Sequence, residues 1–416
     1  MDTVNIVLIL AVVSGFLMAF SLGANDVANS MAAAVGSKAI TVKQAVVIAA
    51  VLNCAGSIFL GSQVAATVAT GIIDASKVPD HTLLMVGMLA ALLSSGLWVL
   101  IATFTGLPVS STHSIVGGII GMGIVLGGPS VVEWKVLIGI FTAWVISPFF
   151  GALISYLVFV HIRRTILYSR SMLTAAKRWA PVWMGLTVVL IVLSVMFKTP
   201  FGKKMAFNWV HGIAAAIVIM VAFIVVSRLL WPKLTAKKEG APERRPKDQV
   251  EEMFRRMQMG TACYVALSQG ANDVANAIGP VAAIYIIARN NMLLDKVEIP
   301  TWLLIMGGVG IAMGIMLLGH KVMGTVGEKI TKMNNSRGFA VAFGSATTVL
   351  LASNLGMPVS TTHASVGSVV GVGLARGFGA VDFRILAKIV LYWVLTLPIA
   401  AFSCIIIYYI LRALFF

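Results

Sequence analysis

Two short polar motifs stand out in a very apolar chain, and each of them occurs twice. The first motif, Gly-Ala-Asn-Asp-Val-Ala-Asn, forms residues 23–29 and recurs as residues 270–276. The second motif begins Pro-Val-Ser, ends Thr-His, forms residues 108–113 and recurs as residues 358–363. The two motifs follow in the same order in both halves. Polar breaks at matching positions of duplicated apolar halves are typical of secondary transporters, which move a solute together with an ion.

The first motif carries the only acidic residues that fall inside predicted apolar spans, Asp26 and Asp273. A carboxylate at that depth costs about 2.5–3.5 kcal/mol on insertion scales, so two at matching positions indicate a use. No Lys or Arg is near either acid in the sequence, and we expect the compensating cation to come from solution. The oxygen-rich surroundings predict a sodium site made of Asn25, Asp26, Asn29, Asn272, Asp273 and Asn276.

Helix interruptions at Gly23 and Gly270 would add free backbone carbonyls to this sodium site, and we expect both helices to be broken there. Two other interpretations of the first motif stay open. The acids are also compatible with carrying a proton instead of sodium. Alternatively, Asn and Asp do no more than cap a broken helix, although the second copy makes capping alone the weaker interpretation.

The second motif predicts the start of a helix, because Gly and Pro end what precedes it and hydroxyl residues suited to an N-cap follow. The N-terminus of a helix offers unpaired N–H groups and a partial positive charge, which together bind phosphate and similar oxyanions. We therefore predict phosphate-binding residues in both copies: Ser110, Ser111, Thr112, Ser360, Thr361 and Thr362. Ordinary capping is the alternative. His113 and His363 are possible accessory residues, but we favour hydrogen bonds to a neighbouring helix for them.

Composition places most of the chain in a lipid bilayer. Hydrophobic residues make up 59% and charged residues 11% of 416 positions, against roughly 45–50% and about 25% in soluble domains. We predict an all-α polytopic membrane protein with about twelve apolar segments of membrane-crossing character, near residues 4–22, 43–65, 82–105, 114–128, 133–160, 181–197, 208–231, 260–288, 301–319, 338–356, 364–375 and 385–412. The segments at 114–128 and 364–375 are short, which favours broken or re-entrant helices, and 260–288 is expected to be interrupted.

The net charge of +16 belongs mostly to loops beside apolar spans, so we expect contact with lipid and no nucleic-acid partner. Basic residues concentrate at 161–180 and 228–258, and basic loops remain cytoplasmic. This places both termini outside the cytoplasm. Within the second loop, residues 248–258 are expected to form a short amphipathic helix on the membrane surface. The predicted domains are residues 1–165 as the first repeat, 166–257 as two connecting helices with a basic cytoplasmic loop, and 258–416 as the second repeat.

An odd number of segments separates the starts of the two repeats, so the halves are expected to be inverted relative to each other across the membrane. The second motif of each half would then approach the membrane centre from opposite sides.

The paired motifs resemble those of the PiT inorganic phosphate transporters, and the resemblance covers both halves, essentially residues 4–165 and 258–412. It implies a plasma-membrane symporter with twelve segments that imports inorganic phosphate with sodium or protons, forms homodimers and has no tightly bound cofactor. It assigns the first motif to the coupling ion and the second to phosphate. One departure is Asn53, where many members carry a glutamate.

We therefore expect a sodium-coupled phosphate importer of the plasma membrane. The alternative within this class is proton-coupled symport of phosphate or of a metal–phosphate complex. A channel is a second alternative, although channels rarely need buried acids in inverted halves. A third is an intramembrane hydrolase that uses Ser110, His113 and Asp26; the tandem duplication weighs against it, so we expect no enzyme.

Overall fold

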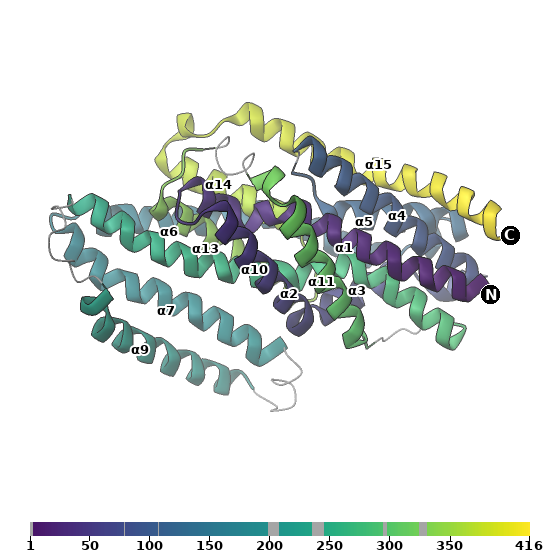
Figure 1. Cartoon of the computed structure of the whole chain (residues 1–416), viewed down its shortest axis with the longest axis horizontal. Coiled ribbons are helices and arrows are strands. Elements are labelled where there is room, and N and C mark those ends of the chain that lie inside the picture. Colours follow the sequence, from purple (N-terminus) through teal and green to yellow (C-terminus); the bar gives the residue numbers. More distant parts are fainter. Residues whose placement is uncertain are drawn as a thin grey trace.

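The chain folds into an elongated bundle of long helices (Figure 1). The computed structural model describes residues 3–78, 80–106, 108–198, 208–234, 245–293, 298–323 and 331–416, and no strand forms among them. Nine helices in this described part are long and apolar enough to cross a membrane. The expected all-α polytopic architecture is therefore confirmed, whereas a total of twelve crossings stays a prediction. The longer helices are α1 (Thr3–Gly36), α2 (Val42–Leu60), α3 (Ser62–Thr70), α4 (His81–Thr105), α5 (Ser111–Gly127), α6 (Trp134–Ile162), α7 (Met172–Lys198), α9 (Trp209–Leu234), α10 (Pro246–Asn290), α11 (Thr301–Leu318), α13 (Asn335–Asn354), α14 (Thr361–Arg376) and α15 (Phe383–Phe415).

The first motif lies in the middle of unbroken helices, so the interruptions expected at Gly23 and Gly270 are wrong. Helix α1 runs through Gly23, and α10 runs through Gly270 and the whole of 260–288. The glycines have a packing role instead. A Cβ at Gly23 would collide with the backbone oxygen of Ile311 in α11, and a Cβ at Gly270 with that of Asn53 in α2. Glycine therefore allows close approach of two backbones at both motifs.

The prediction that residues 248–258 form a helix on the membrane surface is also wrong. These residues form the first turns of α10, whose side chains Val250 and Phe254 are fully buried. Phe254 packs against Phe339 of α13, with 5.8 Å between the ring centroids. The apolar face that suggested contact with the membrane surface is therefore covered by protein. Residues 235–244 of the predicted basic loop lie outside the described part of the chain.

Helices α5 and α14, which begin at the second motif, are short and start inside the protein. Gly106 ends α4 with φ of 68°, and Gly356 follows α13 with φ of 69°, a backbone conformation that glycine adopts without strain. Each chain segment then re-enters as α5 or α14 beside the preceding helix. Figure 1 shows α4 and α5 toward the end that holds both termini, and α13 and α14 toward the opposite end. The breaks expected around these two short segments are therefore observed.

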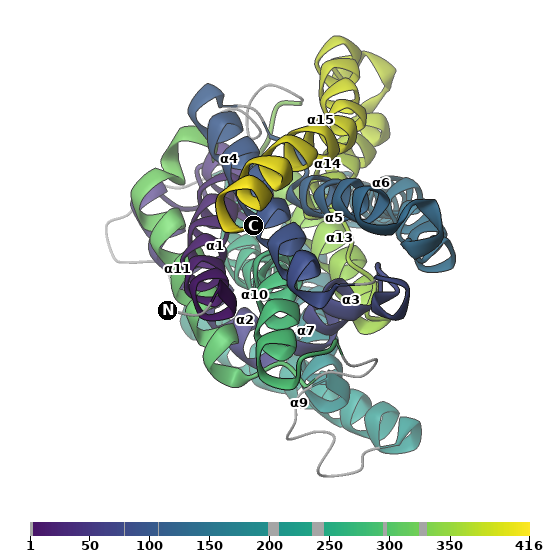
Figure 2. The same ribbon diagram turned by 90° about the vertical axis from the view of Figure 1, so that its right-hand side faces the viewer.

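Glycine contacts repeat between the two halves of the chain. In α5, Gly117 and Gly121 face backbone oxygens of α15, at Leu397 and Ala401. In α14, Gly367 and Gly371 face backbone oxygens of α6, at residues 148 and 152. Figure 2 shows α5 and α14 near the centre of the bundle, with α6 and α15 beside them. These glycines therefore allow close helix packing at matching places in both halves.

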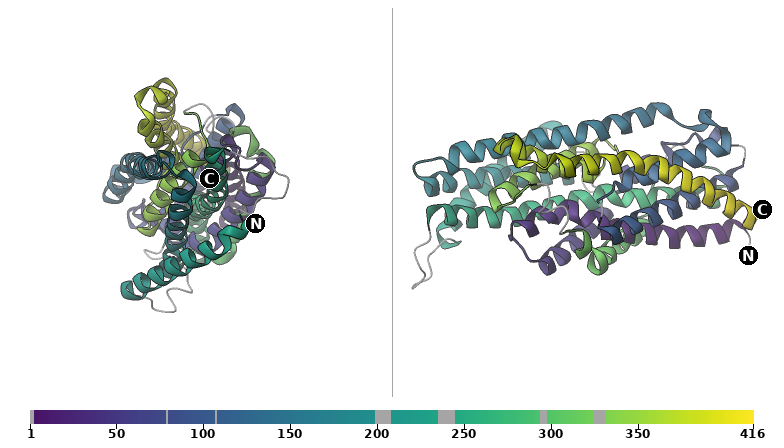
Figure 3. Two further views of the ribbon diagram at one scale, coloured as in Figure 1. Left: turned by 90° about the vertical axis from the view of Figure 1, so that its left-hand side faces the viewer. Right: turned by 90° about the horizontal axis from the view of Figure 1, so that it is seen from above.

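The two termini lie at the same end of the molecule (Figure 3). This agrees with the expectation that both are on one side of the membrane, although the side itself stays a prediction. Helices α7 and α9 pair with each other along one flank of the bundle, as Figure 1 shows.

Replacing Gly314 with alanine tests the packing of α1 against α11. A Cβ there would collide with the backbone oxygen of Phe20, so Gly314→Ala should destabilise the protein by about 1–3 kcal/mol. Gly139→Ala in α6 is the matched control, because its Cβ would meet no atom within 4 Å. Thermal unfolding in detergent should show a lower midpoint for the first variant only. Equal midpoints would contradict the close approach.

Candidate functional site

The two acids of the first motif lie together in the interior, on the neighbouring helices α1 and α10. Asp26 is 1% and Asp273 is 2% exposed, and the two carboxyl groups interact electrostatically. All ion pairs among the described residues are short-range pairs at the surface, and none involves either acid. Two buried carboxyl groups therefore lie close together with no basic side chain to balance them.

The carboxyl group of Asp26 has its oxygens occupied by hydrogen bonds. The hydroxyl of Ser111, at the start of α5, donates to Oδ2 at 2.6 Å. The side-chain amide of Asn29, one turn further along α1, donates to Oδ1 at 3.2 Å. The acid of the first half is thus held by one residue from each of the two motifs.

Asp273 is in a different situation, because some of the oxygens around it have no donor. Asn272 donates to its Oδ1 at 3.1 Å, but Oδ2 is buried without a hydrogen-bond partner among the described residues. The same holds for Oε1 of Gln269 and Oδ1 of Asn276. Positions 269, 273 and 276 follow helical spacing and share one face of α10. Buried acceptors without a partner are costly, and a cation is one way of satisfying three of them together.

The N-termini of α5 and α14 meet directly. The hydroxyl of Ser110 donates to the hydroxyl oxygen of Ser360 at 2.9 Å, and each serine caps its own helix by accepting from the backbone N–H three residues later. Thr112 donates to the backbone oxygen of Val359 at 3.3 Å, and Thr362 donates to that of Val109 at 3.2 Å. The two copies of the second motif therefore exchange matching hydrogen bonds.

Side-chain amides of the first motif join both copies of the second motif into the same site. Asn29 donates to the hydroxyls of Thr361 and Thr362, at 3.3 and 3.0 Å. In the other half, Asn276 donates to the hydroxyl of Thr112 at 3.2 Å. Each amide thus reaches across to the opposite half of the chain. The side chain of Asn272 also contacts the second motif. Its Nδ2 donates to the backbone oxygen of Val359, and its Oδ1 accepts from the backbone N–H of Val359.

The structure brings together nearly all of the residues predicted from the sequence, and every one of them is buried. Asn25 is the exception in position, because its amide donates to Thr103 of α4 at 3.1 Å rather than to a motif residue. The predicted ion and phosphate sets are therefore neighbours within one polar centre.

The two histidines bond neighbouring helices, as favoured from the sequence. Nδ1 of His113 lies 2.9 Å from the backbone oxygen of Trp393, and Nδ1 of His363 lies 2.9 Å from that of Trp144. Each imidazole also packs against the other tryptophan, with centroids 3.9 and 3.8 Å apart. Ser110 bonds Ser360 and not the imidazole of His113, so the arrangement needed for a hydrolytic serine is not formed.

Sequence reasoning missed Gln269, whose amide donates to the backbone oxygen of Asp26 at 2.6 Å. Its counterpart in the first half is Leu22, so a search for duplicated polar residues passes over it. Thr103 and Ser365 were also missed; Ser365 donates to the backbone oxygen of Asn29 at 3.0 Å. Their only sequence signal is a hydroxyl in an apolar helix, which is common.

A polytopic helical protein with buried acids beside two facing helix N-termini has the features of a membrane transporter. Comparison with known proteins agrees: the model of the phosphate transporter family matches residues 22–404. The chain belongs to this family, and it is accordingly a multi-pass membrane transporter and not an enzyme.

Individual relatives cover almost the whole chain. A Pyrococcus furiosus protein with the provisional name phosphate permease is 47% identical over 95% of this chain and 93% of its own length. A Haemophilus influenzae protein with the same provisional name is 37% identical over 97% and 96%. A solved structure described as the sodium-dependent phosphate transporter is similar to this chain with a TM-score of 0.90 and 44% identity, covering 98% of this chain and 99% of that one.

Cysteine pairing tests the contact between the two helix N-termini. In a background without Cys54, Cys263 and Cys404, the double variant Ser110→Cys with Ser360→Cys should form a disulfide, because the two hydroxyl oxygens are only 2.9 Å apart. A protease site placed between residues 235 and 244 allows detection. After cleavage the halves should remain joined on a non-reducing gel, and each single variant should separate. Complete separation of the double variant under oxidising conditions would contradict the contact.

Proposed function

We propose that this chain imports inorganic phosphate across the plasma membrane together with sodium. The observation that carries the proposal is a group of oxygens beside Asp273 that have no hydrogen-bond partner among the described residues. They lie in a centre where two acids form no ion pair with any described basic side chain. Sodium accepts carboxylate, amide and hydroxyl oxygens as ligands, and it adds the positive charge that the two acids need. The predicted ion set thereby extends to Gln269.

Asp273, Gln269 and Asn276 are the residues we expect to hold one sodium ion. Asp26 would accept a second ion with Asn29 and Ser111, after some of the hydrogen bonds that now occupy its oxygens rearrange. The two acids are thus matched in position but differ in their contacts. Donors bond both oxygens of Asp26, whereas Oδ2 of Asp273 has no hydrogen-bond partner within the described part of the chain.

Phosphate is expected to bind where the two helix N-termini meet. The first N–H groups of α5 and α14 point out of each helix and carry partial positive charge. Phosphate would replace the bond between Ser110 and Ser360, and both hydroxyls would then donate to its oxygens. Ser111, Thr112, Thr361 and Thr362 supply further hydroxyls in the same place.

Coupling between the two solutes follows from charge. An empty site has two acids that repel phosphate, and sodium bound at those acids removes the repulsion and adds attraction. Each solute therefore binds better when the other is present, which is the coupling free energy that a symporter requires. The opposite placement of α4 with α5 and of α13 with α14 supports two inverted halves that alternate around this centre (Figure 1). A homodimer, with both termini outside the cytoplasm, remains part of the same proposal.

Asparagine variants of the two acids test the sodium assignment. Asp273→Asn should raise the half-saturating sodium concentration for phosphate uptake at least about tenfold, since about 1.4 kcal/mol of binding is lost per factor of ten. Asp26→Asn is the matched comparison and should have a smaller effect, because donors already occupy its carboxylate. Labelled phosphate uptake into proteoliposomes at constant pH, with an imposed sodium gradient, measures both. Equal uptake driven by a pH gradient without sodium would instead support the proton-coupled alternative.

The variants Thr362→Val and Thr362→Ser test whether this residue binds phosphate. Thr362→Val removes the hydroxyl that donates to Val109 and accepts from Asn29. In the proposed site this hydroxyl would instead donate to a phosphate oxygen. A hydrogen bond to a charged group contributes about 1.5–3 kcal/mol, so the KM for phosphate at saturating sodium should rise at least about tenfold. Thr362→Ser keeps the hydroxyl and should remain close to the unmodified protein. A valine variant with unchanged KM would remove Thr362 from the phosphate site.

A further inference from the structure

A pocket lies between α6 and α7, and none of its lining residues belongs to the polar centre. It has a volume of about 450 Å³, and its walls are formed by Ile154, Leu157 and Val158 of α6 and by Trp179, Trp183 and Leu186 of α7. All exposed area in it is apolar. Because these helices cross the membrane, the pocket opens toward lipid, and an acyl chain is the apolar ligand available there.

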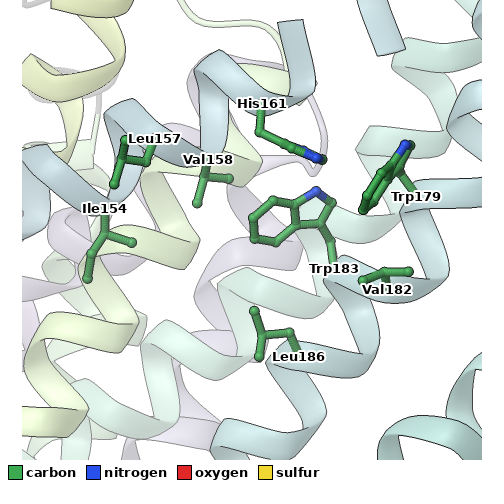
Figure 4. Close-up of a pocket in the computed structure, with 8 residues that line it drawn as sticks. All are labelled: Ile154, Leu157, Val158, His161, Trp179, Val182, Trp183 and Leu186. Atoms are coloured by element: carbon green, nitrogen blue, oxygen red, sulfur yellow. The ribbon is translucent and has the colours of Figure 1, made fainter. Parts of the chain in front are cut away.

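Ring nitrogens lie within the wall at one end of this groove, which we call its polar end (Figure 4). The ring nitrogens of His161, Trp179 and Trp183 gather at one end of the groove, and Ile154 and Leu186 lie at the other. Nδ1 of His161 and Nε1 of Trp183 are buried without a hydrogen-bond partner among the described residues. Neither nitrogen is exposed in the groove, so the rings present only their carbon atoms to a ligand bound there.

Positive charge continues from the polar end of the groove. Residues 161–180 contain Arg163, Arg164, Arg170, Lys177 and Arg178 and no acid. Arg163 donates to the backbone oxygen of Ala375, at the end of α14. The other four are exposed and form no ion pair with a described residue. Arg164 lies one turn beyond His161, and Arg178 lies one turn before Val182, so each continues one wall of the groove.

We propose that this groove binds one anionic phospholipid of the leaflet on the side of residues 161–180. An acyl chain fills the groove, and Arg164 and Arg178 hold the headgroup phosphate. The apolar groove and the exposed basic residues beside it are in the order that such a lipid requires. A second copy of the chain fits less well, because a two-fold contact across the groove brings two basic segments together.

Quenching of Trp183 by brominated lipids tests the proposal directly. The full chain is placed in phosphatidylcholine vesicles that contain increasing fractions of either dibromo-phosphatidylglycerol or dibromo-phosphatidylcholine. The difference between the unmodified protein and Trp183→Phe isolates the fluorescence of this residue. Each basic residue near an anionic lipid contributes about fivefold in affinity. The fraction of dibromo-phosphatidylglycerol that gives half-maximal quenching should therefore be at least about tenfold lower than the fraction of dibromo-phosphatidylcholine.

Two charge variants make the test specific. The double variant Arg164→Gln with Arg178→Gln should lose the headgroup preference. The double variant Arg384→Gln with Lys388→Gln removes the same charge from exposed positions in α15 and should keep it. Equal quenching by both lipids, or a preference that survives the first double variant, would overturn the proposal. So would an absence of quenching by either lipid, which is the result expected if a second copy covers the groove.

Discussion

Two buried acids that form no ion pair with any described residue determine how the rest of this protein must be built. Asp26 and Asp273 lie on adjacent helices in the interior, and their carboxyl groups act on each other electrostatically. Such a pair is unfavourable in a membrane unless hydrogen bonds and cations compensate for it. The surrounding amides and hydroxyls supply part of that compensation. What they leave unsatisfied, three acceptor oxygens on α10, is the physical basis for assigning a sodium ion to this centre.

Close packing of continuous helices is what allows the polar centre to be buried. Glycines on α1, α10, α5 and α14 let these helices approach the backbones of α11, α2, α15 and α6. The packing fixes where α5 and α14 begin, and so it brings two helix N-termini face to face. The proposed phosphate site and the proposed ion site therefore share one frame. Movement of either re-entering helix would change the contacts of both proposed solutes, as coupled transport requires.

Much of the site was predictable because it is duplicated, whereas the missed acceptor on α10, Gln269, is not duplicated. Asp26 and Asp273 could be selected by their depth in apolar spans, and the hydroxyl residues by their position after Gly and Pro. Gln269 was not found, because Leu22 occupies the matching position. The helix breaks at Gly23 and Gly270 were predicted wrongly. Glycine beside Asn and Asp suggests a break, but here each glycine lies where the backbone of a neighbouring helix approaches closely. Residues 248–258 were misplaced because the sequence does not reveal that α13 covers their apolar face.

The central claim is that sodium at the paired acids and phosphate at the helix ends stabilise each other. Equilibrium binding of labelled phosphate to the purified protein, measured over a range of sodium concentrations at fixed pH and ionic strength, tests it most directly. The account predicts that sodium strengthens phosphate binding, and that phosphate strengthens sodium binding by the same factor. Phosphate affinity that is the same in sodium as in an equal concentration of choline would contradict it.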